Sequence, residues 1–375
     1  MAGNFAIGCG VMVAAGSLND LVRALEVSVA LGGQLIAVAA LMMAFGAPLL
    51  AAVVGGWDRR RLLTLSLLWF AGGHIVSALM PSYAALLPVR ALTVVAAAVF
   101  TPQAAAAIGH MTAAQDRGRA ITFIFLGWSL SSVVGMPLHA YIGESFGWRW
   151  AFVLVGVISL VAAVWVWRTV PDGVKPAPLS LSSWRTIFTD PRLFGIVLVT
   201  ALSGAGQFTI FTFFAPYYRQ ELGASPAQVS LLFMWFGAFG LVGNLLMTRY
   251  FDRLGASRVV AISLSLMALS LAAWPLAGGV VTMAIVLIPW ALGCFSSNSA
   301  QQARAGLAVP ALAPGMMALN TSAIYLGQAV GAASGGALLA ASGYRWLPAA
   351  GVVWMLAAIG LSLWLGAQSK GRQRV

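Results

Sequence analysis

Charge is the scarcest property of this 375-residue sequence, since only 8% of its residues are Asp, Glu, Lys or Arg while 61% are hydrophobic. Water-soluble domains carry about 25% charged residues, so this composition excludes a protein whose whole surface faces water. Cysteine is almost absent as well, because Cys9 and Cys294 stand alone in apolar runs. That excludes a disulfide framework and a cysteine-rich metal site, and no cofactor or metal is expected.

Acidic residues are the second scarcity, with nine of them against 21 Lys and Arg. All nine lie near a loop or a helix end of the predicted spans. The three histidines are scattered along the chain. The sequence therefore lacks the Ser/His pair, paired Asp or His-rich metal site that a membrane enzyme would need. We predict that it is not an enzyme, and a membrane enzyme or non-transporting receptor is only a remote alternative.

Long apolar runs fill the chain instead. A membrane-spanning helix needs about 20 consecutive apolar residues. Reading between charges and turn residues predicts an all-α membrane protein with twelve spans, at about 1–18, 30–54, 62–80, 83–111, 120–143, 150–167, 193–217, 226–248, 258–276, 280–302, 315–341 and 346–365.

The basic residues predict the orientation of these spans. With both termini in the cytoplasm, sixteen of the basic residues fall in inner segments, and the outer loops hold only Arg23, Arg149, Arg219 and Arg345. Such a bias marks the cytoplasmic side of a bacterial inner-membrane protein. The basic excess is then orientation chemistry shared with lipid headgroups, and no nucleic-acid partner is expected. The first span is short, so we expect the native chain to begin upstream.

An internal repeat divides the spans into two sets. Gly147-Trp148-Arg149-Trp150 closes the fifth predicted span and Gly343-Tyr344-Arg345-Trp346 closes the eleventh, about half the chain further on. Repeats of this kind indicate two copies of one structural unit. We predict six-helix bundles at 1–170 and 192–375, the second with a short basic tail, joined by a cytoplasmic linker at 171–191.

Four stretches carry a resemblance to the major facilitator superfamily over essentially the full length. They are Gly243-Asn244 through Asp252-Arg253-Leu254-Gly255 to Arg258, then "LLPVRAL" around Arg90, "GWSLSSVVGMPLHAYIGESFGWRWAF" and "ALNTSAIYLGQAVGAASGG". Within this family the chain resembles the drug and sugar efflux branch, the arabinose-efflux-like permeases. The resemblance implies two parallel halves related by a pseudo-two-fold axis along the membrane normal, with the substrate site near mid-membrane between them.

The sequence also departs from the family pattern, mainly in its first half. Gly55 stands in the place of the family's loop aspartate, and the acid Asp58 is displaced by three residues. Thr93 and Val94 replace the usual Gln-Gly after Arg90. In the first span, Val11 stands where many relatives carry a glutamate. A proton antiporter without a carboxylate at mid-membrane needs another group to carry the proton.

Three residues are candidates for proton coupling. Arg90 is the one cation within a predicted span, and buried charge in a membrane is expensive and usually functional; the alternative is a side chain that extends to the outer interface. His139 can titrate near neutral pH, or it can be a neutral histidine bonded between helices. Asp20, at the outer end of the first span, is a coupling group or a solvated acid at a helix end.

Glycines and a signature loop are candidates for conformational change. Small residues let helices approach closely, and we expect the evenly spaced Gly127, Gly135 and Gly143, and Gly327, Gly331 and Gly335, to form sliding contacts between the halves. Pro137 adds a kink, because proline removes a backbone hydrogen bond. Asp252 is expected to cap a helix and pair with arginines, closing the cytoplasmic side as a latch. The latch residues are Asp252, Arg253, Gly255, Arg258 and, in a degraded copy, Asp58.

Polar and aromatic residues on the cavity-lining spans are candidates for the substrate site. They predict a mostly neutral pocket for a small drug-like or sugar-like solute. We expect a monomer in the lipid bilayer that exports this solute in exchange for protons. The alternative is an uncoupled or differently coupled facilitator. The candidates are Gln34, Gln103, Gln207, Phe211, Asn298, Asn320, Tyr325 and Gln328.

Overall fold

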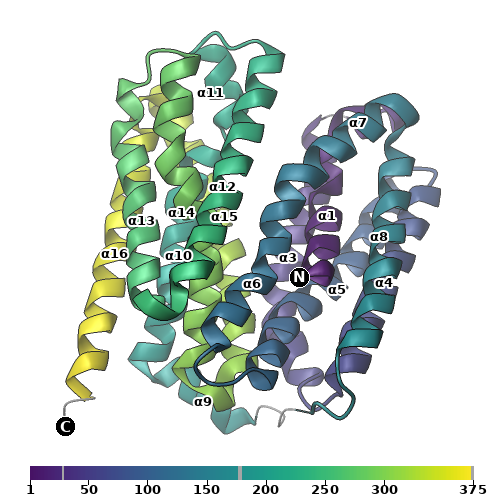
Figure 1. Cartoon of the computed structure of the whole chain (residues 1–375). Coiled ribbons are helices and arrows are strands. Elements are labelled where there is room, and N and C mark those ends of the chain that lie inside the picture. Colours follow the sequence, from purple (N-terminus) through teal and green to yellow (C-terminus); the bar gives the residue numbers. More distant parts are fainter. Residues whose placement is uncertain (28, 176–179, 373–375) are drawn as a thin grey trace. The chain divides into compact units, whose positions relative to one another are not determined.

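The structure, a computed structural model, describes residues 1–27, 29–175 and 180–372, and every regular element in those ranges is a helix. The helices form two units (Figure 1). The first unit contains Met1–Ala113, Phe123–Leu181 and Ala311–Ser322. The second contains Ala114–Thr122, Ser182–Pro310 and Ala323–Val375. The predicted division cuts the chain once, at residues 171–191, whereas each of these units contains several segments. The predicted division stays a prediction.

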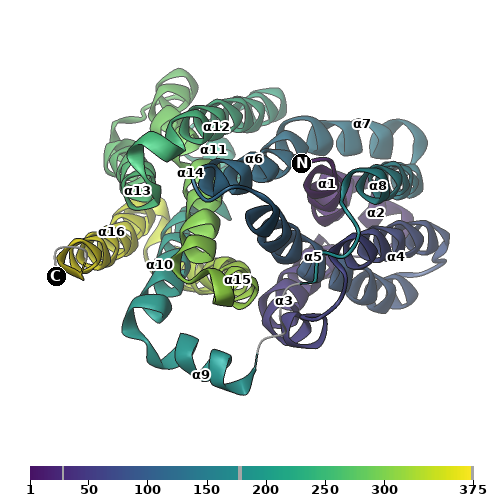
Figure 2. The same cartoon turned by 60° about the horizontal axis from the view of Figure 1, so that its bottom comes forward.

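The first unit is built mainly on the first six apolar spans and one short helix, α2 (Leu18–Ala24), which follows the first span. In it α1 packs against α7 and α8, and α4 packs against α5 and α8 (Figure 2). The fifth span consists of α6 and α7 joined by the π-helical turn η1 (Ser131–Gly135). The spans are α1 (Ala2–Gly16), α3 (Val29–Val53), α4 (Arg59–Leu79), α5 (Tyr83–Met111), α6–α7 (Arg117–Leu130 and Met136–Phe146) and α8 (Trp148–Thr169).

The second unit repeats this plan, with the short helix α11 (Phe214–Gln220) after its first span. A further helix, α9 (Leu181–Thr189), lies in the predicted linker, of which residues 176–179 are outside the described part. In this unit α13 packs against α14 and α16, and α10 packs against α16. The spans are α10 (Pro191–Phe211), α12 (Pro226–Leu254), α13 (Ala256–Ala273), α14 (Val280–Ala308), α15 (Ala313–Ser342) and α16 (Leu347–Arg372).

The predicted count of twelve spans is confirmed. Ten stretches of the described residues are long and apolar enough to cross a membrane, and one of them, Pro310–Ala367, contains both α15 and α16. The shorter apolar helix Ala2–Gly16 supplies the twelfth span. The order and position of the helices therefore follow from the lengths of the apolar runs.

Four predicted span ends are wrong, and one of them is the twelfth, whose helix continues from the predicted residue 365 to Arg372. The seventh span ends at Phe211, because the backbone turns at Thr212 and Phe213 before α11 begins. The eighth continues to Leu254, since nothing breaks the helix before Gly255, whose φ of +78° favours glycine. Asp252 and Arg253 are therefore in the last turn of α12 and not in a loop. The tenth continues to Ala308, which places Arg304 inside α14.

The repeated Gly-aromatic-Arg-Trp turn has the same backbone requirement in both units. Gly147 and Gly343 adopt φ values of +94° and +67° at the junctions of α7 with α8 and of α15 with α16. A residue with a side chain is strained at such φ values. The repeat is therefore conserved between the two halves for a local conformational reason.

Candidate functional site

Arg90 lies inside the first unit and is fully buried. Its Nη1 is 3.1 Å from Nε2 of His74 on α4, and its Nη2 donates to the carbonyl oxygen of Val11 on α1 at 2.9 Å. Arg90 therefore connects α1, α4 and α5 through hydrogen bonds, and its side chain does not extend to the interface. In the described ranges no carboxylate forms an ion pair with Arg90. The ion pair between Asp20 and Arg23 does not involve it.

The hydrogen bonds around His74 determine its tautomer. A guanidinium can only donate, so Nε2 must accept from Arg90. The carbonyl oxygen of Gly10 also lies 3.4 Å from Nε2, and this longer contact is not a hydrogen bond while Nε2 accepts from Arg90. The proton is then on Nδ1, which donates to the carbonyl oxygen of Phe70 at 2.8 Å. The imidazole is neutral in this arrangement, and adding a proton to Nε2 would break its bond to Arg90. The sequence analysis did not select His74, because the rotation of α4 that brings it to Arg90 is not visible in the sequence.

Gly10 on α1 gives His74 and Phe70 the room to approach. A Cβ at position 10 would lie 2.8 Å from Cε1 of His74 and would collide with the ring of Phe70. The rings of Phe70 and His74 meet edge to face, with their centroids 4.3 Å apart. The cation, the imidazole and the first span are therefore held in one tightly packed arrangement.

His139 is fully buried on α7, two residues after Pro137. Proline has no N–H, so the helix cannot form its regular hydrogen bonds there, and the wider π-helical turn Ser131–Gly135 precedes it. The imidazole lies next to the backbone of Cys9 without a hydrogen bond of standard geometry to any described residue. It is therefore a separate buried imidazole on the α1–α7 contact, distinct from the Arg90–His74 pair.

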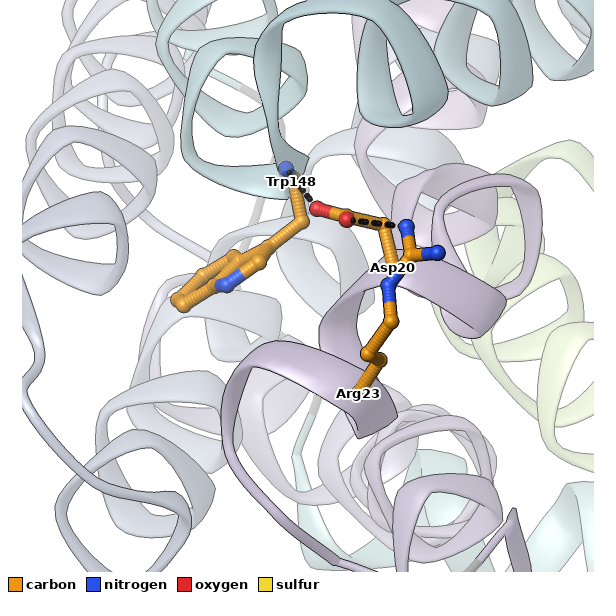
Figure 3. A network of polar contacts seen from close by, with 3 residues as sticks. All are labelled: Asp20, Arg23 and Trp148. Carbon is orange, nitrogen blue, oxygen red and sulfur yellow. Dashed lines mark hydrogen bonds and ion pairs between the residues drawn. The ribbon is translucent and has the colours of Figure 1, made fainter.

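Asp20 acts as a structural connection. Its Oδ2 accepts the backbone N–H of Trp148 at 2.7 Å, and its Oδ1 accepts from Nη2 of Arg23 at 2.8 Å (Figure 3). The carboxylate thus caps the first turn of α8 and holds α2 against it. Both oxygens are engaged and the side chain is 14% exposed. This geometry is that of a helix cap. It supports neither of the two predicted roles of Asp20, as a proton-coupling group or as a solvated acid at a helix end.

The predicted substrate residues differ in their burial and in their hydrogen-bond partners. Gln103 is fully buried on α5 with both amide atoms lacking a described partner, and Oε1 of Gln207 accepts from Sγ of Cys294 at 3.2 Å. Gln34 is exposed and bonds to the hydroxyl of Tyr83. Asn320 is fully buried on α15. The half-buried candidates are Phe211, Asn298, Tyr325 and Gln328.

Phe211 belongs to an aromatic cluster inside the second unit. Its ring lies 4.8 Å from that of Phe214 and 5.6 Å from that of Phe236, measured between centroids. Phe214 in turn contacts Trp274 and Trp290, both nearly fully buried. The cluster packs α10 and α11 against their neighbours, so these rings stabilise the unit.

Asn4 was missed by the sequence analysis. It is 2% exposed on α1, where its Nδ2 donates to the carbonyl oxygen of Ile124 at 3.0 Å and its Oδ1 accepts from Thr101 at 3.3 Å. Nothing in the sequence around Asn4 distinguished it from other polar residues near a helix start.

The two signature loops differ in how their acids are held. Asp58 caps α4 by accepting the N–H of Arg61 at 3.0 Å, and it also accepts the N–H of Gly173 at 2.8 Å. Asp252 is exposed, and no hydrogen bond or ion pair joins it to another described residue; α13 is preceded by Gly255 without a side-chain cap. The expectation that Asp252 caps a helix is therefore wrong, because α12 continues through it. Arg253 and Arg258 are exposed as well.

The glycines approach neighbouring helices within their own unit, and the sliding contacts between the halves stay a prediction. A Cβ at Gly127 would lie 2.5 Å from the carbonyl oxygen of Met1. One at Gly135 would meet Cys9 of α1, and one at Gly143 would meet Ser17, which follows α1. In the second unit, a Cβ at the α15 glycines would collide with backbone carbonyl oxygens of α10. Those pairs are Gly327 with Ala201, Gly331 with Ala205 and Gly335 with Thr209.

Comparison with known proteins identifies the family. The profile of the Major Facilitator Superfamily matches residues 1–221 and 196–374, which together span both units. The chain belongs to the major facilitator superfamily. It is 28% identical to the inner membrane transport protein YdhP of Escherichia coli (strain K12) over 338 residues, covering 90% of this chain and 87% of YdhP. The resemblance stated from the motifs is confirmed.

Two further similarities extend this result. The chloramphenicol resistance protein of Streptomyces lividans is 32% identical over 278 residues, 72% of this chain and 69% of that protein. The crystal structure of the human organic anion transporter MFSD10 (TETRAN) matches with a TM-score of 0.78 at 16% identity, covering 96% of this chain and 98% of MFSD10. The latter confirms the fold. The chain is thus a multi-span membrane transporter of this superfamily.

Proposed function

We propose that this chain is a secondary transporter of the efflux branch, resident in the bacterial inner membrane with both termini in the cytoplasm. It exports a small neutral or amphipathic solute by alternating access, as a monomer. The observation that carries this proposal is the similarity to the chloramphenicol resistance protein over most of the chain. The similarity to an inner membrane transport protein supports the location.

Proton influx drives the export in this proposal, and the Arg90–His74 pair carries the coupling. Protonation of His74 at Nε2 would place two positive charges 3.1 Å apart inside the unit, and such a buried pair is strongly unfavourable. The imidazole therefore takes a proton only in a conformation in which Arg90 has moved away. That links the proton to a rearrangement of α1, α4 and α5. His139, buried on α7, is a second titratable group packed against the same first span, α1.

A proteoliposome experiment tests the coupling. Chloramphenicol is the first solute probe, followed by a panel of neutral sugars and amphipathic drugs. With wild-type protein and an imposed pH gradient, adding the transported solute is expected to move protons measurably across the membrane. His74→Gln is expected to remove the proton movement while solute binding persists, and His139→Gln serves as the matched buried-imidazole comparison.

Uncoupled or differently coupled facilitation is the second candidate function. It is favoured by one observation, namely that Arg90 has no carboxylate partner in the described part of the chain. Solute movement without any proton movement in the same vesicles would establish this alternative and overturn the antiport proposal. No solute movement for any probe would overturn the choice of substrate class.

A further inference from the structure

A cavity of about 140 Å³ opens at one end of the second unit. It lies where α10 and α13 begin and α14 ends, beside α16, and these helices lie next to one another in Figure 2. Two arginines line it, Arg192 from α10 and Arg304 from α14. Side chains of Ile196 and Leu365 complete an apolar part of the wall.

Arg304 is buried there without a counter-charge. It is only 6% exposed, and its Nη1 and Nη2 donate to the hydroxyl and carbonyl oxygens of Ser362, at 2.8 and 3.3 Å. Both acceptors are neutral. Among the described residues no carboxylate forms an ion pair with Arg304 or Arg192. A buried cation that lacks an anionic partner costs considerable free energy, so the site favours an anion from outside the chain.

The acid closest in sequence does not supply that anion. Asp190 precedes Arg192 by two residues, but its carboxylate caps α10 by accepting the backbone N–H groups of Arg192 and Leu193. Both bonds are accepted by Oδ1, and Asp190 does not line the cavity. The two guanidinium groups share the cavity as like charges.

The wall of the cavity adds a third source of positive potential. Ala256 and Ser257 line it, and they are the first two residues of the 18-residue helix α13. Gly255 precedes them and provides no side-chain cap. The backbone N–H groups at a helix start carry partial positive charge and bind oxyanions. Two guanidinium forks and a helix start together suit a phosphate, which accepts several charge-assisted hydrogen bonds at once.

We propose that this cavity binds a phosphate group, supplied by an anionic lipid headgroup or by free phosphate, and that the bound phosphate joins α10, α13 and α14. The apolar part of the wall suits the lipid source, because a headgroup phosphate carries an apolar remainder. The inference does not depend on the transported solute or on proton coupling.

Thermal unfolding of the full-length chain in an uncharged detergent tests this inference. The unfolding midpoint is measured against increasing phosphatidylglycerol, phosphatidylcholine and inorganic phosphate, since a ligand of the folded state raises it. Phosphatidylglycerol is expected to raise the midpoint and phosphatidylcholine is not. Arg192→Gln and Arg304→Gln are each expected to weaken the effect about tenfold or more in ligand concentration.

Arg185→Gln is the matched control, because Arg185 is an exposed arginine of α9 that does not line the cavity. It is expected to leave the response unchanged. A response to phosphatidylglycerol alone identifies the lipid source, and a response to inorganic phosphate as well identifies the free anion, each through the same arginines. No response in the wild type, or an equal response in all three variants, would overturn the proposal. If Arg304→Gln does not fold, Arg192→Gln decides the outcome.

Discussion

The two units hold the same turn in different ways. In the first, the Gly147 turn is fixed by a charged group, since Asp20 after α1 accepts the N–H of Trp148 and pairs with Arg23. In the second, the Gly343 turn is fixed by neutral groups, since the hydroxyl of Tyr344 donates to Oε1 of Gln220 after α10 at 3.0 Å. The position of the connection is preserved while its chemistry is not.

The contacts between the first and fifth spans of each unit differ in a similar way. Against α1, the glycines of the fifth span face backbone atoms at one position and side-chain atoms of Cys9 and Ser17 at the others. Against α10, the glycines of α15 face backbone carbonyl oxygens at all three positions. The thiol of Cys9 can rotate aside, whereas the Cβ of Ser17 and a helix backbone cannot. The second unit should therefore be the less tolerant of the two.

The largest expected effect comes from placing a branched side chain in that second contact. Gly331→Val would push against the carbonyl oxygen of Ala205, and such overpacking destabilises by about 1–3 kcal/mol or more. We expect little folded protein by size-exclusion chromatography in detergent. Gly336→Val is the control, because a Cβ there meets only the ring of Phe213 at 3.7 Å. Equal loss in both variants would contradict the close contact.

A smaller substitution compares the two units directly. Gly135→Ala meets Sγ of Cys9 at 2.9 Å, whereas Gly331→Ala meets the carbonyl oxygen of Ala205. Because the thiol can rotate, we expect Gly135→Ala to lower the unfolding midpoint less than Gly331→Ala does. If Gly135→Ala is the more destabilising of the two, the proposed difference in tolerance is wrong.

The two signature-loop acids provide the third comparison. Asp58→Ala removes a helix cap and the bond to Gly173, and losing a cap costs about 0.5–2 kcal/mol. Asp252→Ala removes an exposed carboxylate that has no described partner. We expect a clear fall in unfolding midpoint for Asp58→Ala and almost none for Asp252→Ala. A fall in transport by Asp252→Ala at unchanged stability would support its role as a latch in another conformation.

The smallest expected effect concerns the two turns. Asp20→Ala removes the cap of α8 and the Arg23 pair, with an expected cost of about 1 kcal/mol. Tyr344→Phe removes one exposed hydrogen bond, and we expect about 0.5 kcal/mol or less. Asp20→Asn is the control, because asparagine caps almost as well as aspartate. Equal effects from Asp20→Ala and Tyr344→Phe would remove the distinction between the charged and neutral connections.

The sequence by itself determined the class of fold, the number and order of the spans and the family. Those features depend on the length of each apolar run and on local turns such as those at Gly147 and Gly343, which neighbouring residues specify. Arg90 was recognisable for the same reason, because a lone cation in an apolar run is costly wherever the helix packs.

Only the tertiary structure decided which side chains meet. Arg90 contacts His74, Asp20 accepts a hydrogen bond from the start of α8, and the glycines of α15 pack against α10. Each meeting depends on how a helix is rotated about its axis, with about 100° between successive residues. A helix that is apolar around its whole circumference has no sequence pattern that fixes this rotation. Packing between neighbouring helices fixes it, and that is why the partners of buried polar groups could not be predicted.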